Sequence, residues 1–120
     1  MKKLLFSLFL IIFLSGCSSV AVNTNQNSSL TIPAGMIYFH SSTCPHCANV
    51  NSYIEQNNIK QKLFFVSKEI NSDKSAYDLA KLVGQKCGIS ESNLGVPLFW
   101  DGQKCYLGDE DIINFLKIKQ

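Results

Sequence analysis

Arginine is absent from this chain of 120 residues, so all eleven of its strongly basic side chains are lysines. Two of these lysines occupy positions 2 and 3, and the nine that remain are matched by nine aspartates and glutamates. Beyond its first residues the chain is therefore close to neutral and has no basic run. A nucleic-acid-binding protein needs clustered basic side chains to neutralise phosphates. The sequence argues against that class, and we expect no nucleic-acid partner.

Histidine is scarce, and the cysteines are poorly spaced for a structural metal. The only histidines are His40 and His46, and the only Cys-x-x-Cys pair is Cys44 with Cys47. A structural zinc site needs four ligands, commonly from a second such pair or from two closely spaced histidines. We therefore expect no metal site of this kind.

A long membrane-spanning apolar run is also missing, since a comfortable span takes about 20 residues. The main apolar run covers residues 4–14 and follows two lysines, which is the form of an export signal. It ends in Leu14-Ser15-Gly16-Cys17, which resembles the lipobox of bacterial lipoproteins. The resemblance implies cleavage before Cys17 and lipidation of that residue. The alternatives are an uncleaved membrane anchor and an ordinary signal peptide.

Three segments follow from this interpretation: a signal peptide over 1–16, a lipidated flexible tether over 17–29, and one domain over 30–120. The tether is rich in Ser, Asn, Gln and Thr and has too few apolar residues to fold. We expect the protein in the bacterial cell envelope, anchored to the lipid bilayer through Cys17 and facing the periplasm or cell exterior. Disulfides persist in those compartments.

Short strands and amphipathic helices alternate along the domain. A β-prone run over 36–40 leads to the Cys-x-x-Cys pair, where Thr43 as N-cap and Pro45 in the first turn predict a helix start. The apolar face of this helix is formed by Cys47, Val50 and Ile54. Asn57-Asn58 is expected to end it.

A second strand is predicted over 63–66, with Phe64 and Phe65 in the core. Ser72 is expected to cap the next helix. Its apolar stripe consists of Ala76, Leu79, Ala80 and Val83, and Gly88 closes it.

The C-terminal third of the chain predicts a hairpin and a last helix. Asp101-Gly102 predicts a type I′ turn, and Trp100 before it is expected in the core. The helix opens with Gly108-Asp109-Glu110-Asp111 and ends near Lys117 and Lys119. Acidic residues at its start and lysines at its end both suit the helix dipole. The predicted order is β-α-β-α-β-β-α, an α/β fold (an α+β sandwich) with a four-stranded mixed sheet.

The Cys-x-x-Cys pair lies at a predicted helix start, where a cysteine thiolate is stabilised. Cys44 at the start of a helix is close to unpaired backbone N–H groups and to the positive end of the helix dipole, and both stabilise a thiolate. Cys47 lies one turn along, within reach for a disulfide with Cys44. The sequence therefore predicts a reactive cysteine with a second thiol beside it.

The combination of a strand, this pair, a helix and a Val-Pro step before a hairpin resembles the thioredoxin superfamily over roughly residues 34–119. Its short plan is most similar to a glutaredoxin. Cys44-Pro45-His46-Cys47 resembles the motif of DsbA-type oxidants, and Gly95-Val96-Pro97 resembles the family's cis-proline loop. Gly108-Asp109 with Asp111 is similar to the turn that opens the last glutaredoxin helix.

This resemblance implies roles for individual residues. Cys44 would be the exposed nucleophile, and Cys47 would resolve the mixed disulfide that it forms. Pro97, if cis, would face both cysteines and leave the backbone of Val96 free to pair with an extended substrate. Pro45 and His46 complete the motif. Protonated His46 would stabilise the Cys44 thiolate and make the disulfide more oxidising.

One position departs from the family pattern. Many thioredoxins carry a buried acid six residues before the nucleophile, whereas this chain has Tyr38 at that position. Glutaredoxins also lack the acid. The departure affects the expected efficiency and direction of exchange rather than the fold. His40 is interpreted as a satisfied structural histidine, with a place in the site as the alternative.

Cys87 and Cys105 have three interpretations: a structural disulfide, a second redox pair, and two buried free thiols. Four cysteines outside the lipobox allow three pairings, and the short spacing of Cys44 and Cys47 favours Cys87 with Cys105. The structural disulfide is the preferred interpretation.

The function expected from the sequence is thiol–disulfide exchange with protein thiols and disulfides, as an oxidant in preference to a reductant. The other classes are a Cu(I)-binding protein using Cys44, Cys47 and His46, and a redox-inert binding lipoprotein. A membrane redox partner and a monomeric state are expected. Glutathione is the only small-molecule co-substrate that the resemblance leaves open, and no other cofactor is expected.

Overall fold

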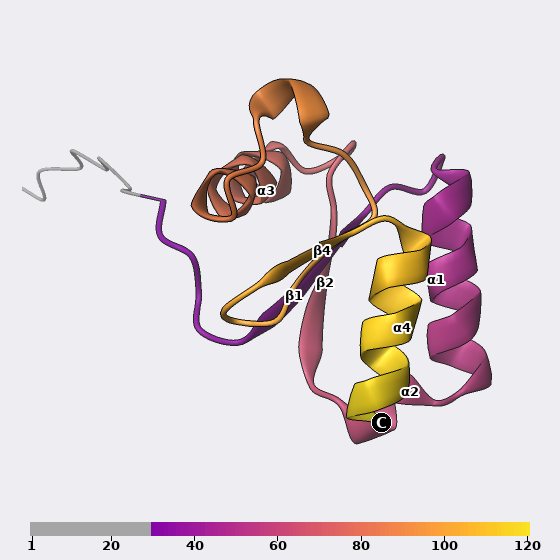
Figure 1. Ribbon diagram of the computed structural model, residues 1–120. Coiled ribbons are helices and arrows are strands. Elements are labelled where there is room, and N and C mark those ends of the chain that lie inside the picture. The colour runs from indigo at the N-terminus through magenta and orange to yellow at the C-terminus, as the bar shows by residue number, and fades with distance from the viewer. Residues whose placement is uncertain (1–29) are drawn as a thin grey trace, which may run out of the picture.

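The computed structural model describes residues 30–120 of the chain. Its elements follow one another in the order shown in Figure 1: β1 (Met36–His40), α1 (Pro45–Gln56), α2 (Ile59–Lys62), β2 (Phe65–Glu69), α3 (Lys74–Lys86), the 3-10 turn η1 (Glu91–Asn93), β3 (Leu98–Trp100), β4 (Cys105–Leu107) and α4 (Asp109–Lys119). The predicted plan is confirmed, and α2 and η1 are additions to it. The signal peptide, Cys17 and the tether lie outside the described residues.

The four strands form one mixed sheet in the order β2-β1-β3-β4. β1 pairs in parallel with β2, because α1 carries the chain back across the sheet between them. β3 pairs antiparallel with both β1 and β4. The C-terminal end of β1 therefore adjoins the start of β3, which brings the Cys-x-x-Cys pair close to the Val-Pro step.

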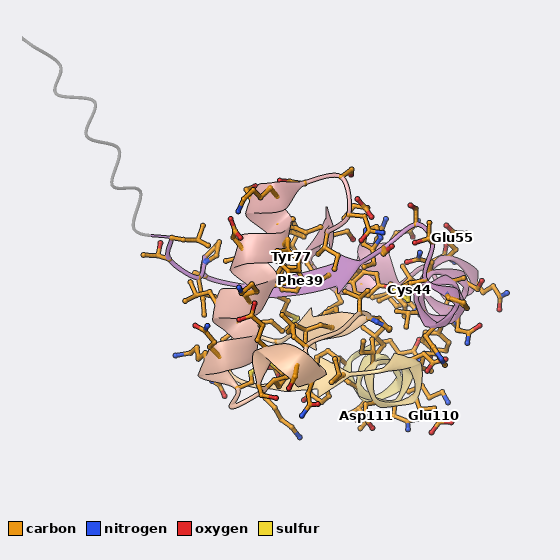
Figure 2. The ribbon with its side chains drawn as sticks, turned by 90° about the horizontal axis from the view of Figure 1, so that it is seen from above. Phe39, Cys44, Glu55, Tyr77, Glu110 and Asp111 are labelled. Atoms are coloured by element: carbon orange, nitrogen blue, oxygen red, sulfur yellow. A yellow bond between two sulfur atoms is a disulfide. The ribbon has the colours of Figure 1, made fainter. Side chains whose placement is uncertain are left out.

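Helices cover both faces of the sheet, and successive residues of β1 alternate between them. Tyr38 packs against the layer formed by α1 and α4, whereas Ile37 and Phe39 pack against α3. Seen from above in Figure 2, α1 and α4 lie side by side, and α3 lies apart from them over the strand that carries Phe39. Both faces of the two central strands, β1 and β3, are therefore buried, and the loops at the end of β1 start from this packed core.

The amphipathic patterns of α1 and α3 are confirmed. The residues assigned to their apolar faces are all buried: Cys47, Val50, Ile54, Ala76, Leu79, Ala80 and Val83. Trp100 is also in the core, as expected. None of the helices between residues 30 and 120 is both long and apolar enough to cross a membrane.

The second strand starts later than predicted, and Phe64 is not in the core. Its side chain is 86% exposed, whereas Phe65 packs against the α1–α4 layer. The short helix α2 buries Ile59 and takes up the residues before the strand, so that β2 begins only at Phe65. Phe64 precedes this edge strand, and the cluster under α3 is built on the other strands, β1 and β3.

Two local predictions are displaced by one residue. The second helix is capped by Asp73, whose carboxylate accepts the N–H groups of Ser75 and Ala76, and not by Ser72. The hairpin turn has Gly102 at its first central position with φ of 99°, and Asp101 pairs with Lys104 through its N–H group. One positive φ at the first central position is the pattern of a type II′ turn.

Candidate active site

Cys44 is itself the N-cap of α1, in place of the predicted Thr43. The N–H group of Cys47 points at Cys44 Sγ, with 3.1 Å between the two atoms. The two cysteines are joined by a disulfide, and their Cα atoms are 5.2 Å apart. Cys47 is 0% exposed and Cys44 is partly exposed. Since the backbone donor and the helix terminus both face Cys44, this sulfur is the one prepared to carry negative charge.

The loop before β3 lies against this sulfur. The peptide bond between Val96 and Pro97 is cis, and the carbonyl oxygen of Val96 is 3.4 Å from Cys44 Sγ. The carbonyl of Pro97 accepts the N–H group of Gly108 at 3.0 Å, which joins this loop to the start of α4. The structure thus brings together the cysteines and the Val-Pro step. Cys44 and Val96 are 52 residues apart in the sequence.

The side chain of His46 pairs with the first residue of α4. Its Nδ1 lies 3.0 Å from Oδ1 of Asp109, and the second carboxylate oxygen of Asp109 accepts the side-chain amide of Asn49 at 2.6 Å. Hydrogen bonds from Asn49 and then from His46 lower the pKa of Asp109, so it stays ionised. Neither contact was predicted. The available signal was the three-residue spacing of His46 and Asn49, which places them on one helix face.

Solved structures with a similar arrangement of elements include glutaredoxins. A wheat glutaredoxin is 21% identical, with 72% of each chain covered and a TM-score of 0.51. A glutaredoxin from Archaeoglobus fulgidus is 19% identical over 70% of this chain and 87% of its own, with a TM-score of 0.50. No family model and no curated protein matches the sequence.

The chain has a glutaredoxin-like thioredoxin fold. The fold expected from the sequence is therefore shown, and a Cys-x-x-Cys pair occupies the start of its first helix. At these identities the comparison concerns architecture, and the chemistry must be argued from the residues of this chain.

A polar network holds the segment that leads into the Cys-x-x-Cys pair of this glutaredoxin-like fold. Ser41 is 5% exposed, and its Oγ accepts the side-chain amide of Asn71 at 2.6 Å and the N–H group of Thr43 at 3.2 Å. The hydroxyls of Ser41 and Thr43 are 3.1 Å apart. The network was not predicted, because Asn71 lies in the loop after β2, 30 residues away from Ser41.

Glu69 ties the same two loops together. Its carboxylate accepts the hydroxyl and the N–H group of Ser72, and it accepts the N–H group of Ser42 at 3.4 Å. These bonds, led by the one from the Ser72 hydroxyl, lower the pKa of Glu69 to about 2. The ionised carboxylate therefore favours the folded loop arrangement.

We expect Glu69→Gln to lower stability at neutral pH and to make little difference in strong acid. Because the folded-state pKa of Glu69 is depressed, its contribution is complete above the ordinary pKa of a glutamate and is lost as the pH falls towards about 2. Urea unfolding midpoints measured across this range test the expectation. Glu55→Gln, on an exposed part of α1, is the control. A deficit in Glu69→Gln that does not change with pH would contradict it.

Tyr38 replaces the buried acid of other thioredoxin folds with a neutral donor. Its hydroxyl donates to the carbonyl of Cys47 at 3.3 Å. Burial raises the pKa of Tyr38 far above its ordinary value, so the phenol remains protonated. It supports the first turn of α1 but offers no base to the Cys47 thiol.

His40 is not the satisfied structural histidine that the sequence predicted. Its ring stacks on Tyr38 with 5.2 Å between centroids, but its buried Nδ1 has no hydrogen-bond partner among residues 30–120. Burial lowers the pKa of His40, opposed by the charge of Glu69. The space beside it, about 190 Å³, is lined by α1, Lys60 and Ser67, and none of them reaches that nitrogen.

Cys87 and Cys105 form the second disulfide, with Cα atoms 6.1 Å apart. The bridge joins the C-cap of α3 to the first residue of β4. In the sequence, the Val-Pro loop lies between these two cysteines. The bridge does not include Cys44 or Cys47.

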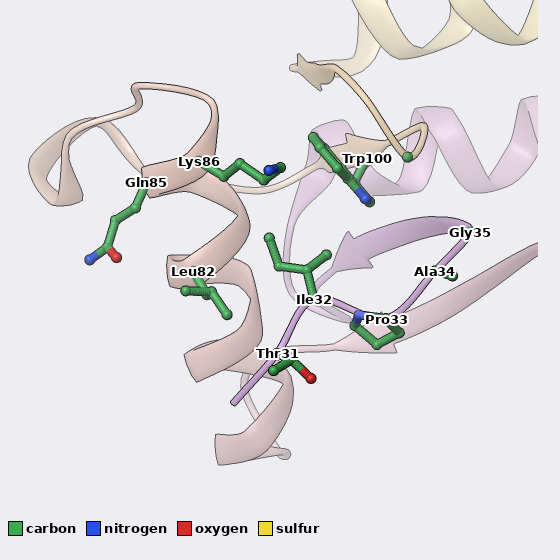
Figure 3. Close-up of a pocket in the computed structure, with 10 residues that line it drawn as sticks. Thr31, Ile32, Pro33, Ala34, Gly35, Leu82, Gln85, Lys86 and Trp100 are labelled. Carbon is green, nitrogen blue, oxygen red and sulfur yellow. The ribbon is translucent and has the colours of Figure 1, made fainter. Parts of the chain in front are cut away.

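The structure also contains a hollow away from these residues. A cavity of about 700 Å³ is lined by the segment before β1 and by side chains that include Leu82, Lys86 and Trp100 (Figure 3). Neither the Cys-x-x-Cys pair nor the Val-Pro loop lines it. Within residues 30–120, no group of three or more His, Cys, Asp or Glu side chains is arranged to hold a metal ion.

Proposed function

We propose that this protein is a thiol–disulfide oxidoreductase that exchanges disulfides with protein thiols through Cys44 and Cys47. The observation that carries the proposal is the position of Cys44 Sγ. It lies 3.1 Å from a backbone donor at the start of α1 and 3.4 Å from the carbonyl of Val96. One sulfur thus faces both a group that stabilises its thiolate and a loop where an extended substrate can pair.

The exchange follows from which sulfur is accessible. A substrate thiolate attacks Cys44 Sγ, because Cys47 is fully buried. The bond between Cys44 and Cys47 breaks as the mixed disulfide forms, and Cys47 leaves as a thiolate that takes up a proton. The second substrate thiolate then attacks the mixed disulfide, so that the substrate is oxidised and Cys44 leaves as a thiolate. The protein gains two electrons and the substrate loses two.

The oxidising direction is favoured because Cys44 is a good leaving group. The N–H group of Cys47 and the helix terminus both stabilise its thiolate, which makes the reduced protein more stable and the disulfide more oxidising. Glutathione is proposed only as a redox co-substrate. The chain lacks arginine, and among residues 30–120 the hydrogen bonds of Cys44, Val96 and Pro97 include none to a lysine. The protein is proposed to work as a monomer.

The proposal includes an envelope location. It is supported by the sequence alone, through the export-type segment over 1–16 and the lipobox that ends at Cys17. Lipid on Cys17 would hold the domain at the membrane surface by a tether, facing the periplasm or cell exterior. An oxidant in that compartment must be reoxidised after each turnover, and a membrane redox partner would do this.

Cys47→Ala tests the proposed function directly. It leaves the nucleophile but removes the thiol that resolves the intermediate. With an excess of a substrate made of two peptides joined by one disulfide, the Cys44 thiolate attacks that disulfide and releases one peptide as a thiol, so we expect most of the protein to accumulate as a mixed disulfide with the other peptide. The species is detected as a mass increase that a reductant reverses. Cys44→Ala is the matched control and should trap none.

Equal trapping by the two variants would contradict the assignment of Cys44 as the nucleophile. Copper bound to the purified wild-type protein, with no exchangeable disulfide, would instead favour the Cu(I)-binding alternative.

A further inference from the structure

Asp109 connects three parts of the site. It is the first residue of α4, and its two carboxylate oxygens bind His46 and Asn49 of α1. The residue before it, Gly108, donates its N–H group to the carbonyl of Pro97. Asp109 is only 18% exposed, whereas His46 is 69% exposed. The carboxylate is therefore the fixed partner and the imidazole is the one that is free to move.

The charge on the site changes with its redox state, but the charge of Asp109 does not. In the disulfide form Cys44 carries no charge, and the imidazole of His46 pairs with Asp109. After reduction, Cys44 is a thiolate two residues from His46 in the first turn of α1. Two anions, the thiolate and the carboxylate of Asp109, then compete for the one side chain of His46, which cannot pair equally with both.

We propose that Asp109 is a positioning residue that competes with reduced Cys44 for His46. This inference rests on the proposed function and concerns the regulation of the same site. While His46 is paired with Asp109, it stabilises the Cys44 thiolate less. The reduced protein is then less stable than it would be if His46 interacted with the thiolate alone. Asp109 thereby moderates the oxidising strength of the Cys44–Cys47 disulfide.

Other charges near this pair come from α4. Glu110 and Asp111 follow Asp109 in the first turn of that helix, and the first turn of α1 contains no acidic residue. A negatively charged carboxylate in the first turn of α4 destabilises the Cys44 thiolate by electrostatic repulsion. The effect of Asp109 through His46 must therefore be separated from the effect of removing a negative charge.

The experiment compares Asp109→Asn with Glu110→Gln in the full-length protein. Both remove one negative charge, but only the first removes the ionic partner of His46 and keeps an amide that can accept the same hydrogen bond. The equilibrium constant of the Cys44–Cys47 pair with glutathione is measured at about pH 5.5, low in the range where histidine changes charge. We expect Asp109→Asn to favour the reduced form by roughly two- to fivefold, the size of an exposed ion pair, and Glu110→Gln to have a smaller effect.

Two further variants complete a double-mutant cycle. In a His46→Asn background, Asp109→Asn should lose most of its effect. The pH dependence of alkylation of reduced Cys44 gives a second readout, and Asp109→Asn should shift it to lower pH. A merely structural role for Asp109 would change stability and leave both readouts in place.

Three results are informative. Coupling between Asp109 and His46 supports the inference. Equal effects of Asp109→Asn and Glu110→Gln, or an effect that persists without His46, overturn it while the proposed function stands. A wild-type Cys44–Cys47 pair that does not exchange with glutathione or with a dithiol peptide overturns the proposed function and this inference with it.

Discussion

Cys44→Ser is expected to abolish disulfide exchange and return the rate to that of the uncatalysed reaction. A serine hydroxyl stays protonated and does not attack or accept a disulfide sulfur, so no mixed disulfide can form at position 44. The rate is measured with a fluorescent dithiol or disulfide peptide in a glutathione buffer. No substitution at another position removes both the nucleophile and the disulfide that it stores.

The control for this substitution is Ala48→Ser, which adds a hydroxyl at an exposed position in the same part of α1 and should exchange at the wild-type rate. The fold is checked by circular dichroism. Because Cys44 is the N-cap of α1, serine keeps a side-chain acceptor for the N–H group of Cys47. Folded Cys44→Ser that exchanges as fast as wild type would mean that another thiol carries the reaction.

Local patterns in the sequence predicted the elements that the structure contains. Apolar residues at three- and four-residue steps identified the buried faces of α1 and α3, and the positive φ of Asn58 and Gly88 agrees with the predicted helix ends. These features depend on neighbours within one or two turns. The cis-proline loop was inferred from the resemblance to a known family, and the structure places it against Cys44.

The unpredicted parts of the site depend on contacts between distant segments. Asp109 meets His46 across 63 residues, and Asn71 meets Ser41 across 30. Periodicity along one helix says which face is polar but not which distant polar group will lie opposite. The prediction that Phe64 lies in the core was wrong for a related reason. Two adjacent apolar residues do not reveal from sequence that only one of them faces a covering helix.

The long-range contacts position the site without a buried acid. The segment that leads into Cys44 is held by Ser41 and Asn71, and the start of α1 is linked to α4 through Asp109. On the other side, Tyr38 supports the carbonyl of Cys47. Each of these contacts positions the cysteines, and none offers an ionisable group to the buried Cys47 thiol.

The second large effect is expected from removing the Cys87–Cys105 disulfide with the double variant Cys87→Ala/Cys105→Ala. The bridge spans 18 residues of sequence, and in the chain-entropy model its loss costs about 3 kcal/mol of stability. For a domain of this size that corresponds to a fall in Tm of roughly 12–24 °C. Thermal and urea unfolding under non-reducing conditions measure both quantities.

The bridged segment contains the loop that faces Cys44. It runs through η1 to Val96, and two other contacts also hold it against α3. Lys81 pairs with Glu91 at 2.5 Å. Leu94 packs closely on Gly84, so that a Cβ atom added to Gly84 would lie 2.7 Å from Cδ1 of Leu94. These contacts remain in the double variant. We therefore expect it to exchange disulfides at close to the wild-type rate at temperatures well below its transition.

The two measurements together decide what the bridge does. A large loss of stability with exchange retained identifies a structural disulfide. Loss of exchange in a variant that is still folded at the assay temperature would instead show that Cys87 and Cys105 pass electrons to the Cys44–Cys47 pair, as a second redox pair would. Unchanged stability would contradict the structural role, because closing this segment must restrict the unfolded chain whatever the bridge does in catalysis.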